Sequence, residues 1–372
     1  MNVSHVVIAR FANGGIGDHL SCLIGSWWFA KQTGRTLIID WRGSRFNTDA
    51  TRKHNCFTDF FGFYQNLAGV NVICDDTVAD LPLAGPFFPA KWNAENLAGT
   101  SHVSHTNEEI NKVNHIVHQG SDTLEPTVAF NQWISPDPPQ NEVRLLLNAL
   151  QFSNQISAAA TQIWQDKIGA KPAIAIHLRH GNGENIGFRA SYWLGPYRLF
   201  KQLKHNLAVN VHRAGSNGRF GDNMPDSLIQ TENFSGSELN FLRRIKQEVE
   251  KMQSQIPNAT VILFCDSQSV ALAFQQLIPT VVIPPKFFLE ANSGPLHSIK
   301  MNQTENDAKI NRISFEMAME MELMRRCSAL ICMDSGFSIF SKALLDDDKK
   351  VLLRPLLMNK IVEKIVNKLN SD

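Results

Sequence analysis

The sequence predicts an α/β protein of two domains, each with a parallel sheet. Short runs of β-branched and other apolar residues alternate with helical patterns, which is typical of βαβ units. The chain has 372 residues, more than the length at which one hydrophobic core usually stops growing. A Pro-rich stretch, NQWISPDPPQNE, separates two series of such units and indicates the junction between the domains.

The first series contains three candidate strands, in HVVIARF, RTLIIDW and VNVICDD, with a helix between the first two. The second series has PAIAIHLR, TVILFCD, TVVIP and SALICMD, with SELNFLRRIKQEVEKMQSQ as an intervening helix. We therefore expect an N-terminal domain at 1–160 and a C-terminal domain at 170–372. Two segments interrupt the pattern, near residues 100–120 and 205–237, and we interpret both as surface insertions, the second as a long loop.

Composition excludes several partners. The 36 Lys and Arg residues balance 35 Asp and Glu residues, so the overall charge would attract neither nucleic acid nor an anionic membrane. No apolar run approaches the roughly 20 residues of a membrane helix, and the first residues resemble a strand more than a secretory leader. Six scattered cysteines without a C-x-x-C pair favour reduced thiols and a cytoplasmic location, although export by a specialised secretion system stays open.

A glycine-rich turn follows the first strand in IARFANGGIGDHLSC. Gly14, Gly15 and Gly17 would let the backbone approach a bound group, and Asp18 stands in the first turn of the following helix. The spacing fits neither G-x-G-x-x-G nor a P-loop. A tight connection is the alternative, but the carboxyl end of a strand is where open α/β sheets bind ligands.

The stretch AIAIHLRHGNGEN is the stronger candidate site. Its strand would bring His177, Arg179 and His180 to the sheet edge, followed by the exposed amides of Gly181, Asn182 and Gly183. A guanidinium fork, a histidine and bare amides together predict a pyrophosphate clamp. The alternative is an arginine ion-paired beside a glycine turn. Glu184, the one carboxylate of this loop, is either a general base or a partner that neutralises an arginine.

Three further motifs offer polar groups near predicted strand ends. Asp266 and Ser267 follow the strand TVILFC, where they would bind a ribose or base edge or simply cap a helix. In DSGFSIFSKA, hydroxyls and amides at a helix start would bind phosphate oxygens, with capping as the alternative. His297 in SGPLHS serves either loop chemistry or packing. Two H-x-x-H pairs, His102/His105 and His115/His118, lie in the first insertion without a cysteine, and we assign no metal site.

The motifs GGIGDHLSCLIGSWWFAKQTGRTLIIDWRGS, GPFFPAKW, IHLRHGNGENI, FCDSQSV, SGPLHS and DSGFSIFSKA resemble, in this order, those of the bacterial nodulation fucosyltransferases of the NodZ type and other α-1,6-fucosyltransferases (glycosyltransferase family 23). The resemblance spans nearly the whole chain. It implies a GT-B-like fold, in which two Rossmann-type domains face a central cleft, with GDP-fucose on the C-terminal side and the acceptor on the N-terminal side.

The resemblance implies that the nucleotide site is lined by Arg179, His180, Asp266, Ser335, Phe337 and Ser338, and the residue patterns described above supply the rest of the candidate site. The expected nucleotide-binding residues are His177, Arg179, His180, Gly181, Asn182, Gly183, Asp266, Ser267, His297, Ser335, Gly336, Phe337 and Ser338. The expected catalytic residues are Arg179, His180 and Glu184, and the acceptor-side loop comprises Gly14, Gly15, Gly17 and Asp18. Such enzymes transfer fucose with inversion and without a metal or cofactor.

The leading hypothesis is therefore transfer of fucose from GDP-fucose to a GlcNAc-containing oligosaccharide, with a chitooligosaccharide-like acceptor and an α-1,6 linkage by resemblance. Two alternatives remain open. One is a sugar-nucleotide or glycan binding protein of the same fold that has lost turnover, which the insertion at 205–237 and the uncertain base motivate. The other is a protein O-fucosyltransferase-like enzyme. The oligomeric state is not predicted.

Overall fold

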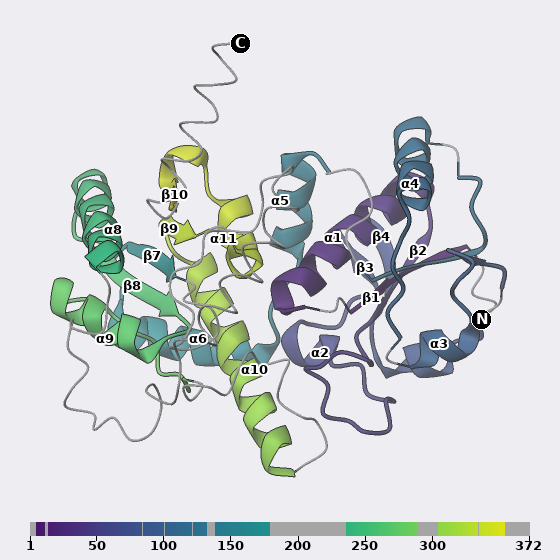
Figure 1. Ribbon diagram of the computed structural model, residues 1–372, viewed down its shortest axis with the longest axis horizontal. Helices are drawn as coiled ribbons and strands as arrows, with labels where there is room; N and C mark the ends of the chain where they lie inside the picture. The colour runs from purple at the N-terminus through teal and green to yellow at the C-terminus, as the bar shows by residue number, and fades with distance from the viewer. Residues whose placement is uncertain are drawn as a thin grey trace. The chain divides into compact units, whose positions relative to one another are not determined.

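The structure is a computed structural model of the chain (Figure 1). It describes residues 5–11, 14–83, 85–99, 101–120, 122–131, 138–178, 236–288, 304–333 and 335–353, with the backbone alone at 236–240 and 304–306. The chain divides into two compact units. The first comprises 1–170, 300–327 and 336–346, and the second comprises 171–299, 328–335 and 347–372. Two late segments thus belong to the first unit, which the sequence did not indicate.

The first unit contains a six-stranded sheet in the order β3-β4-β2-β1-β6-β5. Its strands are β1 (Val6–Arg10), β2 (Thr36–Asp40), β3 (Asn66–Leu67), β4 (Val70–Ile73), β5 (Phe87–Phe88) and β6 (Thr127–Phe130). All neighbours pair in parallel except β3 and β4. The chain passes from β1 toward β2 and β4 on one side and returns to β6 on the other. The order therefore reverses at β1, and open α/β sheets bind ligands at the carboxyl end of such a reversal.

Helix α1 (Ile16–Thr33) follows β1 directly and lies alongside it (Figure 1). Twelve of its 18 residues are buried, so the helix is part of the core rather than an amphipathic cover. It ends at Gly34, whose φ of 69° is the left-handed conformation that glycine adopts at low cost. This fixed helix determines where the glycine-rich turn at its start is held.

The first unit contains further helices. They are α2 (Phe57–Phe60), η1 (Asp76–Asp80), α3 (Ala94–Ala98), α4 (Asn107–Gln119), α5 (Gln140–Ala149), α6 (Asn154–Lys167), α10 (Thr304–Arg325), η5 (Gly336–Ser338) and α11 (Ile339–Leu344). Among them, α6 packs with α10 and α5 packs with α11. The interpretation of residues near 100–120 as a surface insertion is wrong for α4. Thr106 caps this helix, and Val113, Ile116 and Val117 are buried, because their spacing gives it an apolar face.

The second unit has a four-stranded parallel sheet in the order β10-β9-β7-β8. Its strands are β7 (Ala173–Leu178), β8 (Thr260–Cys265), β9 (Ala329–Met333) and β10 (Lys350–Leu353), and η6 (Asp347–Lys349) precedes the last. Three of the four runs predicted in this half form strands. The fourth, TVVIP, does not, because Val282 makes only an isolated bridge with Ile262 of β8.

Helices α8 (Gly236–Gln255) and α9 (Gln268–Leu277) pack their apolar residues with those of β7, β8 and β9 in one core. Leu242, Ile245 and Val249 recur at helical spacing on α8 and are each fully buried. All six cysteines of the chain are buried and free. Among the helices of the described residues, none combines the length and apolarity needed to cross a membrane.

Candidate functional site

Predicted nucleotide-binding residues gather at one edge of the sheet in the second unit. His177 is the penultimate residue of the central strand β7, between Phe264 of β8 and Cys332 of β9. Asp266 and Ser267 directly follow β8, and Ser335 lies just beyond β9. Because parallel strands end at the same edge, these side chains belong to one edge of the second unit. This edge is where α/β sheets place their ligands.

Ser267 is a helix cap, as the alternative interpretation allowed. Its hydroxyl accepts a hydrogen bond from the amide of Val270 at 3.3 Å, and its side chain is buried. Asp266 is half-buried beside it. Lys286, which sequence reasoning missed, donates its ammonium to the Cys265 carbonyl at 2.8 Å. A cation thus lies at the carboxyl end of β8, and only the tertiary fold brings it there.

The predicted clamp lies outside the described residues. Arg179, His180, Gly181, Asn182, Gly183 and Glu184 follow β7 directly in the sequence, and His297 falls in a second range that the structure does not describe. Their roles stay predictions. What the structure does place is His177, the residue two positions before Arg179, at the carboxyl edge of β7.

The glycine-rich turn lies in the first unit, between β1 and α1. Gly15 is the N-cap of α1 and has extended backbone angles. The Asp18 carboxylate accepts a hydrogen bond from the Gly15 amide at 2.8 Å, which is the half of a capping box that a glycine without a side chain can form. Asp18 thus holds the turn and stabilises the helix start through its negative charge. Gly15 itself is exposed, with open space on the side where a Cβ atom would point.

A second predicted motif meets this turn. Gly336 of η5 and Gly17 of α1 pack backbone against backbone: a Cβ atom on Gly17 would stand 2.4 Å from the Gly336 carbonyl carbon. Ser338 is fully buried and Phe337 is partly buried. The structure therefore brings together residues that the sequence assigned to opposite sides of the site, Gly17 to the acceptor side and Gly336 to the nucleotide side.

His19 contacts the backbone of this turn from the buried side of α1. Sequence reasoning missed this residue. Its ring is fully buried on the first turn of α1, with Nδ1 3.0 Å from the Gly15 carbonyl oxygen and Nε2 2.8 Å from Ser44 Oγ. Burial lowers the pKa of His19 to about 3. Arg45 follows Ser44 and is partly buried, and its charge acts on both Asp18 and His19. Only the position of His19 one residue after the G-G-x-G-D motif could have drawn attention to it.

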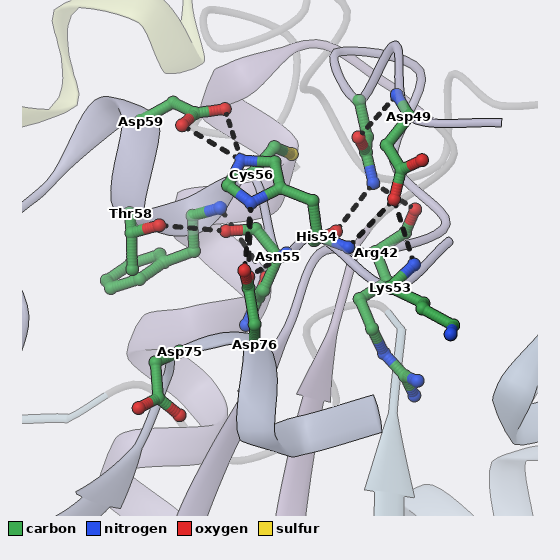
Figure 2. A network of polar contacts seen from close by, with 12 residues as sticks. Arg42, Asp49, Lys53, His54, Asn55, Cys56, Thr58, Asp59, Asp75 and Asp76 are labelled. Atoms are coloured by element: carbon green, nitrogen blue, oxygen red, sulfur yellow. Dashed lines mark hydrogen bonds and ion pairs between the residues drawn. The ribbon is translucent and has the colours of Figure 1, made fainter. Parts of the chain in front are cut away.

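Ser44 belongs to the long loop between β2 and α2, which a polar network holds in place (Figure 2). The Asn47 amide donates to the carbonyls of Arg42 and His54 at 2.7 and 2.8 Å. The Asp49 carboxylate accepts from the His54 amide at 2.8 Å, and such bonds lower the pKa of Asp49 well below its usual range. The loop is therefore closed on itself near both ends.

The His54 ring closes the far end of this loop, between two carboxylates (Figure 2). Nε2 lies 2.9 Å from Asp59 and Nδ1 lies 3.1 Å from Asp76. Partial burial alone would lower the pKa of His54, but the hydrogen bonds and charges of Asp59 and Asp76 outweigh it and raise the pKa above 6.5. Protonated His54 thus joins the starts of α2 and η1.

Buried charged residues also lie at the carboxyl edge of the six-stranded sheet in the first unit. Arg10 and Asp40 are paired residues at the ends of β1 and β2, and Asp40 accepts both guanidinium bonds of Arg42, at 2.9 and 3.1 Å. Arg10 donates to the carbonyls of Asn96, Gly99 and Ser101. Burial lowers its pKa to about 10. These cations are held by protein partners, which gives them a role in fixing the loops at this edge.

No group of three or more His, Cys, Asp or Glu side chains within the described ranges is arranged to hold a metal ion. Of the four histidines in the H-x-x-H pairs, His105 is buried, and burial lowers its pKa to about 4.

Comparison with known proteins extends these observations over most of the chain. The profile of the nodulation protein Z (NodZ) family matches residues 3–219. Nodulation protein Z of Bradyrhizobium diazoefficiens is 33% identical over 321 residues, which cover 85% of this chain and 72% of that protein. The protein of the same name from Sinorhizobium fredii is 28% identical over 272 residues, 68% of this chain and 83% of that protein.

The fold agrees with a solved relative. The crystal structure of NodZ α-1,6-fucosyltransferase soaked with GDP-fucose has a TM-score of 0.59 and 22% identity, and the match covers 92% of each chain. At this identity the similarity shows the α/β fold with parallel sheets. Together with the family match over more than half of the chain, these similarities show that the protein belongs to the nodulation protein Z family.

Proposed function

We propose that this protein transfers fucose from GDP-fucose to a GlcNAc-containing oligosaccharide, with a chitooligosaccharide-like acceptor and an α-1,6 linkage. The observation that carries the proposal is its 33% identity to a nodulation protein Z along 85% of the chain. The solved NodZ structure, whose fold this chain shares, is described as an α-1,6-fucosyltransferase and was soaked with GDP-fucose.

In the proposed arrangement, two Rossmann-type domains of a GT-B-like fold face a central cleft. The edge with His177, Asp266 and Ser335 receives the nucleotide, and the glycine-rich turn serves the acceptor side. The proposal is supported by the packing of Gly17 on Gly336, which joins two of the predicted motifs within the first unit. Bare glycine backbone there would admit a sugar closely.

The proposed reaction inverts the configuration at fucose C1. The acceptor hydroxyl oxygen attacks C1 while the bond from C1 to the β-phosphate oxygen breaks, and the electron pair leaves with GDP. Glu184 accepts the hydroxyl proton. Arg179 and His180 offset the charge that develops on GDP, as fixed donors do for a developing anion. Because these cations would stabilise the leaving group, the proposed reaction uses neither a metal ion nor a cofactor.

The decisive experiment measures GDP release with GDP-fucose and chitooligosaccharides, followed by mass spectrometry of the sugar product. We expect a product heavier by one fucose and no turnover with UDP-sugars. Activity with UDP-sugars alone would reject the donor. GDP binding by calorimetry without transfer to any glycan of a broad panel would favour the binding protein, and labelled polypeptide would favour the O-fucosyltransferase-like alternative.

The cytoplasm remains the proposed location. Six free cysteines support it, because cysteines stay reduced in that compartment.

A further inference from the structure

His19 connects the glycine-rich turn with the loop after β2, where its partner Ser44 is 25 residues away in the sequence. On one side, its Nδ1 meets the carbonyl oxygen of Gly15, the N-cap of α1. On the other side, its Nε2 meets the hydroxyl of Ser44 in the loop after β2. The ring therefore spans from the glycine-rich turn to a loop that its own polar network holds closed.

The chemistry of these contacts fixes the state of the ring. A carbonyl oxygen only accepts, so Nδ1 must carry the hydrogen and donate it to Gly15. Nε2 of the neutral ring is then an acceptor, and the Ser44 hydroxyl donates to it. Burial keeps the ring neutral, since the pKa of His19 falls to about 3. One tautomer thus satisfies both bonds at every pH where the protein would work.

Aromatic side chains prevent the ring from turning away. Trp41 meets it edge to face, with 4.9 Å between ring centroids, and the ring of Phe46, in the same loop as Ser44, lies 5.3 Å away. Phe11, at the end of β1, is 6.4 Å away. The ring is therefore packed on three sides and both of its nitrogens are bonded, so it can rotate little. A displacement of Ser44 would then move the ring and, through it, the Gly15 carbonyl.

We propose that His19 is a positioning residue for the transfer reaction, which holds the glycine-rich turn in its reactive place through the Ser44–His19–Gly15 relay. This inference rests on the proposed function and adds a residue to it. The turn packs on Gly336 within the first unit, so a shift of the turn would also displace the motif that begins at Gly336. His19 is buried and touches no substrate; it acts through Gly15.

Three variants separate the two bonds. His19→Phe keeps a ring of similar size and removes both. His19→Asn places an amide near the Nδ1 position, so it retains the bond to Gly15 and loses the one to Ser44. Ser44→Ala also loses that second bond, together with the bond that the Ser44 hydroxyl oxygen accepts from the Phe46 amide at 3.2 Å. The matched control is Trp27→Phe, which removes one buried bond of the same helix, from Trp27 Nε1 to the Leu67 carbonyl at 3.0 Å, far from the turn.

The kinetic readout is kcat against KM, measured below the unfolding temperature of each variant. We expect His19→Phe to lower kcat by about tenfold to a hundredfold, the cost of a small misplacement of a reacting site, while KM for GDP-fucose and for the acceptor change little. His19→Asn and Ser44→Ala should each cause a smaller loss, and the double variant should be no worse than Ser44→Ala alone, because each single variant already removes the bond between His19 and Ser44. Trp27→Phe should lower only the unfolding temperature.

Hydrogen exchange of the free protein gives a readout that needs no activity. We expect peptides covering 14–19 to exchange faster in His19→Phe than in the unaltered chain, and to be unchanged in Trp27→Phe. If the unaltered chain transfers no fucose, the proposed function fails, and unchanged exchange at 14–19 would separately overturn the relay. Normal kcat in a folded His19→Phe, additive losses in the double variant, or an equal kinetic loss in Trp27→Phe would also overturn it.

Discussion

Gly17 and Gly336 lie backbone against backbone, so that a Cβ atom added to Gly17 would stand 2.4 to 2.7 Å from three backbone atoms of Gly336. Backbone cannot give way as a flexible side chain does. We expect Gly17→Ala to lower the free energy of unfolding by about 1 to 3 kcal/mol, the usual cost of overpacking. Denaturant titration followed by circular dichroism measures this change.

Gly15→Ala is the matched variant in the same turn. Its Cβ atom would meet nothing within 4 Å, and its backbone angles suit any residue. We therefore expect Gly15→Ala to cost less stability than Gly17→Ala, below about 1 kcal/mol for alanine as the N-cap of α1. It should reduce fucose transfer, because the new methyl group would occupy the space that a bound sugar approaches. Equal stability losses in both variants would argue against the packing of Gly17 on Gly336.

Arg179→Ala tests the proposed clamp. Loss of a fixed donor to a developing anion removes roughly 3 kcal/mol of transition-state stabilisation, so kcat should fall by a factor on the order of a hundred. Arg179→Lys keeps the charge but not the fork, and it should recover only part of this loss. Steady-state kinetics with GDP-fucose check both variants. Near-normal turnover in Arg179→Ala would remove this residue from the proposed mechanism.

Chelation tests the proposed independence from metals. If Arg179 and His180 offset the charge on departing GDP, EDTA should leave the rate of fucose transfer unchanged, since no cation would be required there. The measurement is initial rate before and after dialysis against EDTA, with a metal-dependent glycosyltransferase treated in parallel. Activity that disappears in EDTA and returns with Mn²⁺ would contradict the proposal.

Local patterns predicted the strands better than the connections between distant segments. β1, β2, β4, β7, β8 and β9 all fall inside predicted runs, because buried parallel strands are continuous apolar stretches. TVVIP has the same composition but forms only a bridge at Val282. Composition alone cannot tell whether an apolar run pairs along its whole length with a neighbouring strand. The return of 300–327 and 336–346 to the first unit depends on packing between residues far apart in sequence, which periodicity does not record.

In the candidate site, too, residues placed by local pattern were predicted, and residues placed by contacts between distant segments were not. Sequence reasoning correctly placed His177, Asp266 and Ser335 at or just beyond strand ends, because strand ends can be located from local pattern, and their roles stay predictions. It missed His19 and Lys286, whose importance comes from partners 25 and 21 residues away. It also separated Gly17 from Gly336 by role, since only the fold reveals that they touch. The residues of the predicted clamp, 179–184, lie outside the described ranges and stay predictions.

His54 predicts a pH dependence of stability. The hydrogen bonds and charges of Asp59 and Asp76 outweigh its partial burial, so its pKa in the folded protein is above 6.5. A raised pKa means that folding favours the protonated form. The contribution of His54 to stability is therefore fully present below pH 6.5, and it is lost as the pH rises through the folded pKa.

His54→Gln should consequently destabilise the protein more at pH 6 than at pH 9. The side chain is 37% exposed, so solvent screens its charge, and we expect a difference of about 0.5 kcal/mol, within the range of exposed ion pairs. Urea titrations at the two pH values measure it. Lys53→Gln removes the neighbouring exposed cation and should cost the same at both. A His54→Gln effect that grows toward pH 9 would mean that the ring binds Asp59 and Asp76 in its neutral form, and not as the cation that their charges favour.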